Sequence, residues 1–171
     1  LAALGADVIL TGSNPEQIAL LNREAAQSGK KSYRYMAVDF LDQDSTRRFL
    51  EELGGMGKID VCINNAGINR INFIDETLVE DWRDISAVNL DAPFLVTRTV
   101  SKIMKANGYG RIVNIASIFG VISKAKRSLY SMTKFGLRGL TVSSSIDLAP
   151  YNVLVNAVSP GFVITELTQR I

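Results

Sequence analysis

Ile59-Asp60-Val61-Cys62-Ile63, followed at once by Asn64-Asn65-Ala66-Gly67, is the stretch of sequence that decides the fold. It is a short, mostly apolar run that ends in a polar loop with a glycine, which predicts a buried strand leading into a turn. Similar β-rich runs stand at 8–10, 33–40, 112–115 and 153–158. The chain therefore contains five candidate strands.

Helical patterns separate these strands. They cover 15–27, 44–53, 77–106 and 129–148, with a break expected near Asn89. Asn14 is a candidate N-cap for the first helix, and Thr77-Leu78-Val79-Glu80 fits a capping box. Apolar strands that alternate with helices indicate a parallel sheet covered on both sides. We expect an α/β fold, a doubly wound Rossmann-type parallel sheet with helices on both faces.

Composition limits the chemistry. The 171 residues are 47% hydrophobic, which predicts one globular domain over 1–171. The chain has no histidine, and this excludes a Ser-His-Asp triad and nearly all catalytic zinc sites. We therefore expect no metal, and acid/base chemistry must come from tyrosine, lysine or carboxylates.

Charge and hydropathy exclude other classes of partner. The formal charge is +2, from 19 basic and 17 acidic residues without a polybasic block, so we expect no nucleic acid. No apolar stretch approaches the roughly 20 residues that span a bilayer, so we expect no membrane partner. Cys62 is the single cysteine, which rules out an internal disulfide and favours a reducing compartment. We expect a cytoplasmic protein.

One pair of side chains stands out. Tyr130 and Lys134 are four residues apart in the last predicted helix and so lie on the same face. A neighbouring ammonium lowers the pKa of a tyrosine from about 10, which would let Tyr130 exchange a proton with a substrate oxygen. Taken alone, such a pair is more often a solvated helix surface than a catalytic site. Ser117 adds context, because it follows the strand 112–115 where parallel strands form a ligand crevice.

Several motifs together resemble the short-chain dehydrogenase/reductase family, in its order and at its usual spacings. The similarity covers nearly the whole chain and is greatest to ketoreductase-like members, including 3-oxoacyl-acyl-carrier-protein reductases. The residues that carry it are Asn64-Asn65-Ala66-Gly67, Asn89, Gly110 to Ser117, Tyr130-Ser131-Met132-Thr133-Lys134 and Asn156 to Gly161.

The resemblance implies a role for each motif. Tyr130 would be the catalytic acid/base, and Lys134 would lower its pKa and hydrogen-bond the nicotinamide ribose. Ser117 would orient the substrate oxygen, and Asn89 would hold a water in a proton relay. The expected cofactor contacts are Ser13, Asp39, Phe40, Asn65, Ala66, Gly67, Tyr130, Lys134, Pro160, Gly161, Val163 and Thr165.

The N-terminus departs from the family pattern. The family begins with a strand and a glycine-rich turn that cradles the pyrophosphate, and residues 1–7 resemble the end of the helix after that turn. We expect the domain to be incomplete at both ends, to lack the first strand and phosphate loop, and to be inactive by itself. After the strand 8–10, Gly12-Ser13-Asn14 has no carboxylate to repel a phosphate, so we favour NADP(H) over NAD(H).

Three functional hypotheses follow from the resemblance. The first is reduction of a ketone to a secondary alcohol on a small-molecule substrate, free or carrier-bound, as in a 3-oxoacyl-thioester reductase. The second is a sugar or surface-polysaccharide-pathway dehydrogenase of the same family. The third is a nucleotide-binding homologue without turnover. The resemblance also predicts a homo-oligomer, a dimer or tetramer that pairs through the helices near 90–106 and 129–148.

Overall fold

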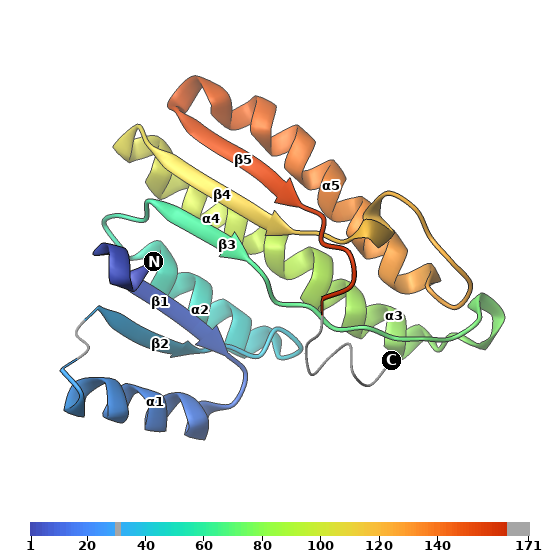
Figure 1. Ribbon diagram of the computed structural model, residues 1–171, viewed down its shortest axis with the longest axis horizontal. Helices are drawn as coiled ribbons and strands as arrows, with labels where there is room; N and C mark the ends of the chain where they lie inside the picture. The colour runs from blue at the N-terminus through green and yellow to red at the C-terminus, as the bar shows by residue number, and fades with distance from the viewer. Residues whose placement is uncertain (30–31, 164–171) are drawn as a thin grey trace. The chain divides into compact units, whose positions relative to one another are not determined.

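The structure is a computed structural model that describes residues 1–29 and 32–163. It consists of two compact units, Leu1–Leu53 and Gly54–Ile171, which we describe separately. Parallel strands alternate with helices in both, as Figure 1 shows, and this confirms the predicted α/β class.

The N-terminal unit is a βαβα segment. Its elements are η1 (Ala2–Leu4), β1 (Val8–Gly12), α1 (Pro15–Gln27), β2 (Tyr33–Ala37) and α2 (Gln43–Gly54). Strands β1 and β2 pair in parallel, with Val8 opposite Tyr33. The predicted cap is confirmed, because the Asn14 side chain accepts a hydrogen bond of 3.0 Å from the backbone N–H of Gln17.

The second unit holds the remaining elements. They are β3 (Val61–Asn64), η2 (Ile74–Glu76), α3 (Val79–Ser86), the π-helical segment η3 (Ala87–Asp91), α4 (Ala92–Asn107), β4 (Gly110–Ile115), η4 (Ile118–Gly120), α5 (Ser128–Leu148), η5 (Ala149–Tyr151) and β5 (Val153–Val158). The three strands form a parallel sheet in the order β3-β4-β5. The predicted five strands are thus all present, but hydrogen bonds join them in two sheets, one in each unit.

Two helices cover one face of the β3-β4-β5 sheet. Helix α4 contacts all three strands and α5 contacts β5. The side chains of Ile112 and Val153 on this face are fully buried, whereas Leu154, which points to the other face of β5, is 45% exposed. The core of the second unit therefore lies between the sheet and these two helices.

A buried network of polar side chains crosses this core. Asn64, at the end of β3, donates hydrogen bonds to Thr97 Oγ1 (3.2 Å) and Asn114 Oδ1 (2.8 Å). Asn114, which is fully buried on β4, donates to Thr141 Oγ1 at 2.9 Å. The network connects the ends of two strands to α4 and α5, and a paired network of this kind fixes one arrangement of the layers.

The break near Asn89 is a π-helical segment, and Pro93 accounts for it. A proline has no N–H and its ring clashes with the carbonyl four residues earlier, which here belongs to Asn89. The helix widens instead, and the backbone N–H of Ala92 donates to the carbonyl of Ala87, five residues back. Asn89 was the expected signal of the break, but Pro93 is its physical cause.

The capping box predicted at Thr77 is wrong. Helix α3 begins at Val79 with Leu78 as its N-cap, and no side chain caps it. The Thr77 hydroxyl donates instead to the carbonyl of Phe73 at 3.0 Å, which closes the preceding 3-10 turn. A threonine hydroxyl can accept from a following backbone N–H or donate to a preceding carbonyl, so the sequence pattern alone did not fix its partner. Among the described residues, no helix has the length and apolarity to span a membrane.

A close contact between η4 and α5 gives a test of this packing. A Cβ atom on Gly120 would lie 2.8 Å from the backbone carbonyl oxygen of Lys134, whereas a Cβ on Gly57 meets nothing within 4 Å. We expect Gly120→Ala to destabilise the protein by about 1–3 kcal/mol, because backbone must move. Gly57→Ala should instead stabilise the protein by about 0.4–1 kcal/mol, because it restricts the unfolded chain. Urea unfolding followed by the fluorescence of Trp82 measures both, and equal midpoints would contradict the packing described.

Candidate active site

Ser117 lies at the point where β4 and β5 end. The backbone N–H of Ala116 donates to Val158 at 2.8 Å, and that of Ile118 donates to Pro160 at 3.0 Å, so the loop is tied to the segment after β5. The Ser117 hydroxyl accepts a hydrogen bond from Phe119 N (3.2 Å) and keeps its own proton to donate. The fold thus holds a hydroxyl donor at the carboxyl end of the sheet.

Tyr130 stands in the first turn of α5 and faces this hydroxyl. Its ring packs edge-on against Phe119, with 6.3 Å between the ring centroids. Burial raises the pKa of the Tyr130 phenol, while the hydrogen bond with Ser117 and the positive charge of Arg127 oppose that rise. The expected lowering by Lys134 is not found, because burial dominates and the nearby charge belongs to Arg127.

Lys134 is almost fully buried one turn further along α5. Its ammonium donates to the carbonyl of Ile115 at 2.8 Å, and Nζ lies 5.6 Å from the centroid of the Tyr130 ring. Burial lowers the pKa of Lys134 from 10.5 to about 8. The sequence-predicted trio of hydroxyl, phenol and amine therefore comes together, although the catalytic role of each remains a prediction.

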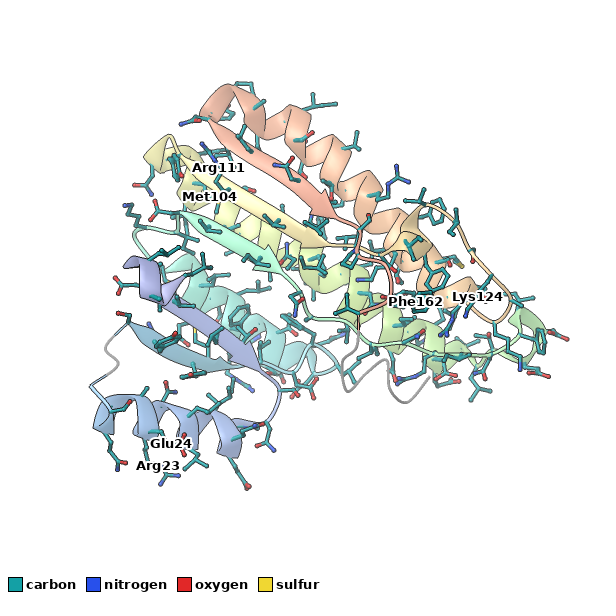
Figure 2. All side chains as sticks on the ribbon, in the orientation of Figure 1. Arg23, Glu24, Met104, Arg111, Lys124 and Phe162 are labelled. Carbon is teal, nitrogen blue, oxygen red and sulfur yellow. The ribbon has the colours of Figure 1, made fainter. Side chains whose placement is uncertain are left out.

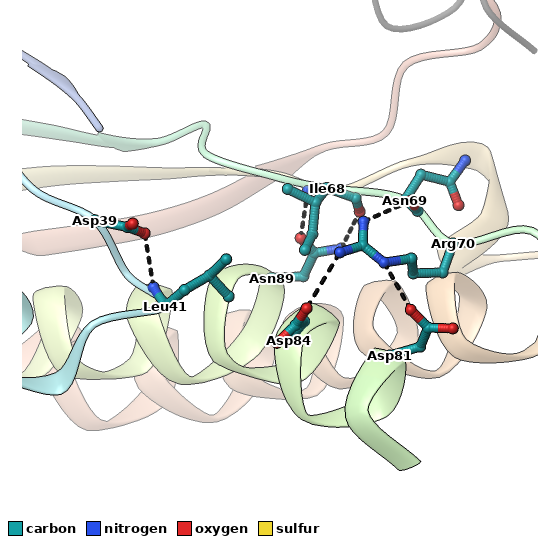
Figure 3. Close-up of polar contacts among 8 residues, drawn as sticks. All are labelled: Asp39, Leu41, Ile68, Asn69, Arg70, Asp81, Asp84 and Asn89. Atoms are coloured by element: carbon teal, nitrogen blue, oxygen red, sulfur yellow. Dashed lines mark hydrogen bonds and ion pairs between the residues drawn. The ribbon is translucent and has the colours of Figure 1, made fainter. Parts of the chain in front are cut away.

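Asn89 is fully buried, and its side-chain amide makes hydrogen bonds within the protein. Its Oδ1 accepts from Ile68 N at 2.8 Å and its Nδ2 donates to Ile68 O at 2.9 Å (Figure 3). The same Nδ2 also donates to Thr133 Oγ1 at 3.3 Å. The amide therefore pairs with both backbone groups of Ile68 and connects this loop to α5. The water relay expected of Asn89 remains a prediction, and the amide's observed task is to position the loop.

Arg70 fixes the same loop at a second point, which the sequence analysis missed. Its guanidinium pairs with Asp81 (2.9 Å) and Asp84 (3.2 Å), both on α3 (Figure 3). Two aspartates three residues apart lie on one face of a helix, so this spacing after an arginine-bearing loop was the available signal. Together with Asn89, the ion pairs hold the loop that begins with Asn65-Ala66-Gly67.

The space around Gly67 fits a ligand with hydroxyl groups. A Cβ at this position would lie 3.6 Å from Asn89 Oδ1 and 3.8 Å from Lys134 Nζ, so a glycine keeps the space between loop and lysine open. Lys134 has three donor hydrogens, and within residues 1–29 and 32–163 the carbonyl of Ile115 is its one hydrogen-bond acceptor. These residues fit the ribose of a nicotinamide cofactor.

The other expected cofactor contacts are placed as follows. In the N-terminal unit, Ser13 follows β1 and is exposed, the Asp39 carboxylate accepts from Leu41 N at 2.9 Å (Figure 3), and Phe40 packs edge-on against Phe49. In the second unit, Pro160, Gly161 and Val163 follow β5. Thr165 lies outside the described residues. Across the described part of the chain, no group of three or more potential ligands could hold a metal ion.

Comparison with known proteins decides the family. The family model described as short chain dehydrogenase matches residues 1–171. The chain belongs to the short-chain dehydrogenase/reductase family. This membership confirms the resemblance inferred from the motifs and the Rossmann-type fold class.

Relatives within the short-chain dehydrogenase/reductase family carry different names. The chain is 38% identical over 169 residues to 3-oxoacyl-[acyl-carrier-protein] reductase FabG of Aquifex aeolicus, covering 98% of the chain and 68% of the relative. It is 32% identical over 172 residues to D-beta-hydroxybutyrate dehydrogenase of Rhizobium meliloti, covering 99% and 67%.

A solved structure of the same family shares the fold. It is the gluconate 5-dehydrogenase of Burkholderia cenocepacia in complex with NADP and tartrate, with a TM-score of 0.86 and 31% identity. The match covers 96% of this chain and 65% of that protein. The chain thus spans about two thirds of the length of its relatives.

The buried Lys134 predicts an unusual dependence of stability on pH. Its pKa is about 8 when folded and 10.5 as a free side chain, so the unfolded chain binds more protons between these values. The free energy of unfolding should therefore rise across this window, by up to roughly 3 kcal/mol. Below pH 8, Lys134→Met should be more stable than the parent by a similar amount, because it removes the cost of a buried charge.

Urea unfolding at about pH 7 and about pH 9.5 measures this difference, with Lys102→Met, an exposed lysine on α4, as the control. We expect the stability of Lys134→Met relative to the parent to be smaller at the higher pH. Lys102→Met should have the stability of the parent at both pH values. A Lys134→Met protein that is less stable than the parent near pH 7 would contradict the assignment.

Proposed function

We propose that the protein containing this chain is an NAD(P)-dependent oxidoreductase that interconverts a ketone and a secondary alcohol. The observation that carries the proposal is the convergence of Ser117, Tyr130 and Lys134 at the carboxyl end of the sheet. Membership of the short-chain dehydrogenase/reductase family supports it.

The chain's own groups would handle the proton. The raised pKa of Tyr130 keeps the phenol protonated at neutral pH, which is the state that gives a proton to a carbonyl oxygen during reduction. Ser117 would donate a hydrogen bond to the same oxygen as negative charge develops there.

The cofactor would supply or accept the hydride. The ammonium of Lys134 and the backbone of Asn65 to Gly67 would hold its ribose, and Pro160 to Val163 would lie beside the nicotinamide. Thr165 is proposed for the same contact, and Ser13, Asp39 and Phe40 for the adenosine end. We propose NADP(H) rather than NAD(H), because Gly12-Ser13-Asn14 has no carboxylate to repel the 2′-phosphate.

The relatives are named for different substrates. Their names include a reductase of a carrier-bound 3-oxoacyl group and dehydrogenases of hydroxybutyrate and gluconate. The sequence-based preference is the carrier-bound thioester, with the sugar-type substrate as its alternative. All of them share the carbonyl or alcohol at which the proposed chemistry takes place.

Substitution of Tyr130 tests the proposal. In the protein expressed from its complete reading frame, Tyr130→Phe should lower kcat for ketone reduction by about 10²–10⁴-fold, because only the proton donor is lost. The affinity for NADPH, measured by fluorescence titration, should stay the same. Tyr109→Phe, which also loses one hydroxyl, is the matched control and should keep its activity. Unchanged turnover in Tyr130→Phe would leave a nucleotide-binding homologue without catalysis as the better hypothesis.

We also propose that the protein forms a homo-oligomer through α5. Met132, Phe135, Gly139, Val142 and Ile146 recur at alternating spacings of three and four residues and so form one face, which we call the α5 stripe. Its four large side chains are 45–70% exposed. An apolar stripe of this kind is typical of helices that pair with another copy.

Charge introduced into the α5 stripe tests this pairing. We expect Ile146→Glu to shift the protein toward monomers in sedimentation velocity, because a carboxylate would be buried without a partner. Gln17→Glu, on an exposed position of α1, adds the same charge elsewhere and should leave the distribution unchanged. Equal distributions for both variants would speak against the stripe as the interface.

A further inference from the structure

Arg127 carries a positive charge in a buried position. The residue is 4% exposed, and its Nε and Nη1 atoms have no hydrogen-bond partner. Within the described residues, no carboxylate lies within ion-pair distance of it. An arginine cannot release its proton at physiological pH, so the positive charge remains in place. Such a group is costly, and its presence calls for an explanation beyond folding.

The position of Arg127 is next to the proposed catalytic tyrosine. It precedes α5 by one residue and accepts a hydrogen bond of 2.8 Å from Ser131 N, so it lies about one turn before Tyr130. The guanidinium carbon is 5.7 Å from the centroid of the Phe119 ring, the same ring that packs edge-on against Tyr130. Arg127 and Tyr130 therefore share one neighbour and one side of the site.

Two further polar groups accompany Arg127. The Oγ atom of Ser128, the next residue, is also buried and has no hydrogen-bond partner. The ring of Phe119 also packs edge-on against that of Phe162. The exposed Lys124 places its ammonium 5.9 Å from the Phe119 centroid and 5.7 Å from the Phe162 centroid (Figure 2). Donors and positive charge thus gather beside Tyr130 without an anion from the described chain.

We propose that Arg127 binds a carboxylate of the substrate, which makes the substrate a small oxo or hydroxy acid. The inference rests on the proposed function and specifies its substrate class. The planar guanidinium matches a carboxylate with two parallel hydrogen bonds, and the Ser128 hydroxyl can donate a third. Because Arg127 is only one turn from Tyr130, the carboxylate must lie within a few bonds of the reacting carbon, as in 2-oxo and 3-oxo acids.

The burial of Arg127 separates this substrate from a carrier-bound thioester. A 3-oxoacyl thioester has no free carboxylate near its ketone, so it would leave the guanidinium unpaired. The acidic surface of a carrier protein would need exposed cations, and Arg127 is buried. A site built around a charged hydrogen bond discriminates strongly against a substrate that lacks the matching group. The structure thus favours a free acid over the thioester preferred from the sequence.

Matched substrates test the inference in the protein expressed from its complete reading frame. The panel pairs 2-oxo and 3-oxo acids with their methyl esters and includes a pantetheine thioester of the same 3-oxo acid. We expect the parent to prefer an acid to its ester and to the thioester. Arg127→Met should lower kcat/KM for the acid by on the order of 100-fold more than kcat/KM for the ester. Arg127→Lys should keep part of the preference.

Arg83→Gln is the control, because it removes an exposed arginine from α3. It should behave as the parent on every substrate. A parent that prefers the thioester, or an equal loss on acid and ester in Arg127→Met, would overturn the inference. Turnover of esters without any preference for acids would overturn it while leaving the proposed oxidoreductase function intact.

A binding measurement tests the inference independently of turnover. Absence of turnover on every substrate would count against the proposed function and not against the carboxylate site. Without ligand, the urea midpoint of Arg127→Met should equal or exceed that of the parent, because an unpaired buried charge is removed. Butyrate, a carboxylate that cannot react, should raise the midpoint of the parent and not that of Arg127→Met. A destabilised Arg127→Met protein, or equal stabilisation of both by butyrate, would show that the guanidinium serves the fold.

Discussion

The hydrogen bond from the Lys134 ammonium to the carbonyl of Ile115 is the interaction on which the candidate site depends. It connects the first turns of α5 to the last residue of β4, so it sets where Tyr130 stands relative to Ser117. The bond is made by a buried cation, whose desolvation is costly and whose pKa falls to about 8 as a result. The proposed catalytic centre is therefore positioned by a buried ammonium, which lowers the stability of the fold. Such a conflict between stability and activity is common in active sites.

Polar side chains inside the second unit provide the rigidity that this arrangement needs. Asn64 and Asn114 link the ends of β3 and β4 to Thr97 on α4 and Thr141 on α5. Asn89 and Arg70 then hold the loop after β3 at two places. Each amide or guanidinium is paired, so burial does not leave these groups unsatisfied. Arg127 differs from them, because its buried donors lack partners, and that contrast identifies it as a group prepared for a ligand.

The sequence predicted the elements well where the pattern was local. The strand at 153–158 and the helix at 15–27 agree with the structure at both ends, because apolar runs, an asparagine cap and a proline mark them directly. It failed where a side chain had a choice of partners. Thr77 closes a 3-10 turn and does not cap α3. Burial raises the pKa of Tyr130, whereas its four-residue spacing to Lys134 had predicted a lower pKa. The spacing gives no information on how far the phenol is buried. The missing partners of Arg127 depend on contacts between distant segments, which no local sequence pattern reveals.

Pro93 shows how one covalent feature shapes the site. The donor that its ring removes cannot be restored by a change of pH, solvent or ligand, so the widened turn is a permanent property of the backbone. Asn89 is thereby placed in a helix that cannot relax to regular geometry, and its amide stays directed at the loop carrying Ile68. The constraint on the position of Asn89 is therefore covalent. It is present as soon as the chain is synthesised and does not depend on any other interaction.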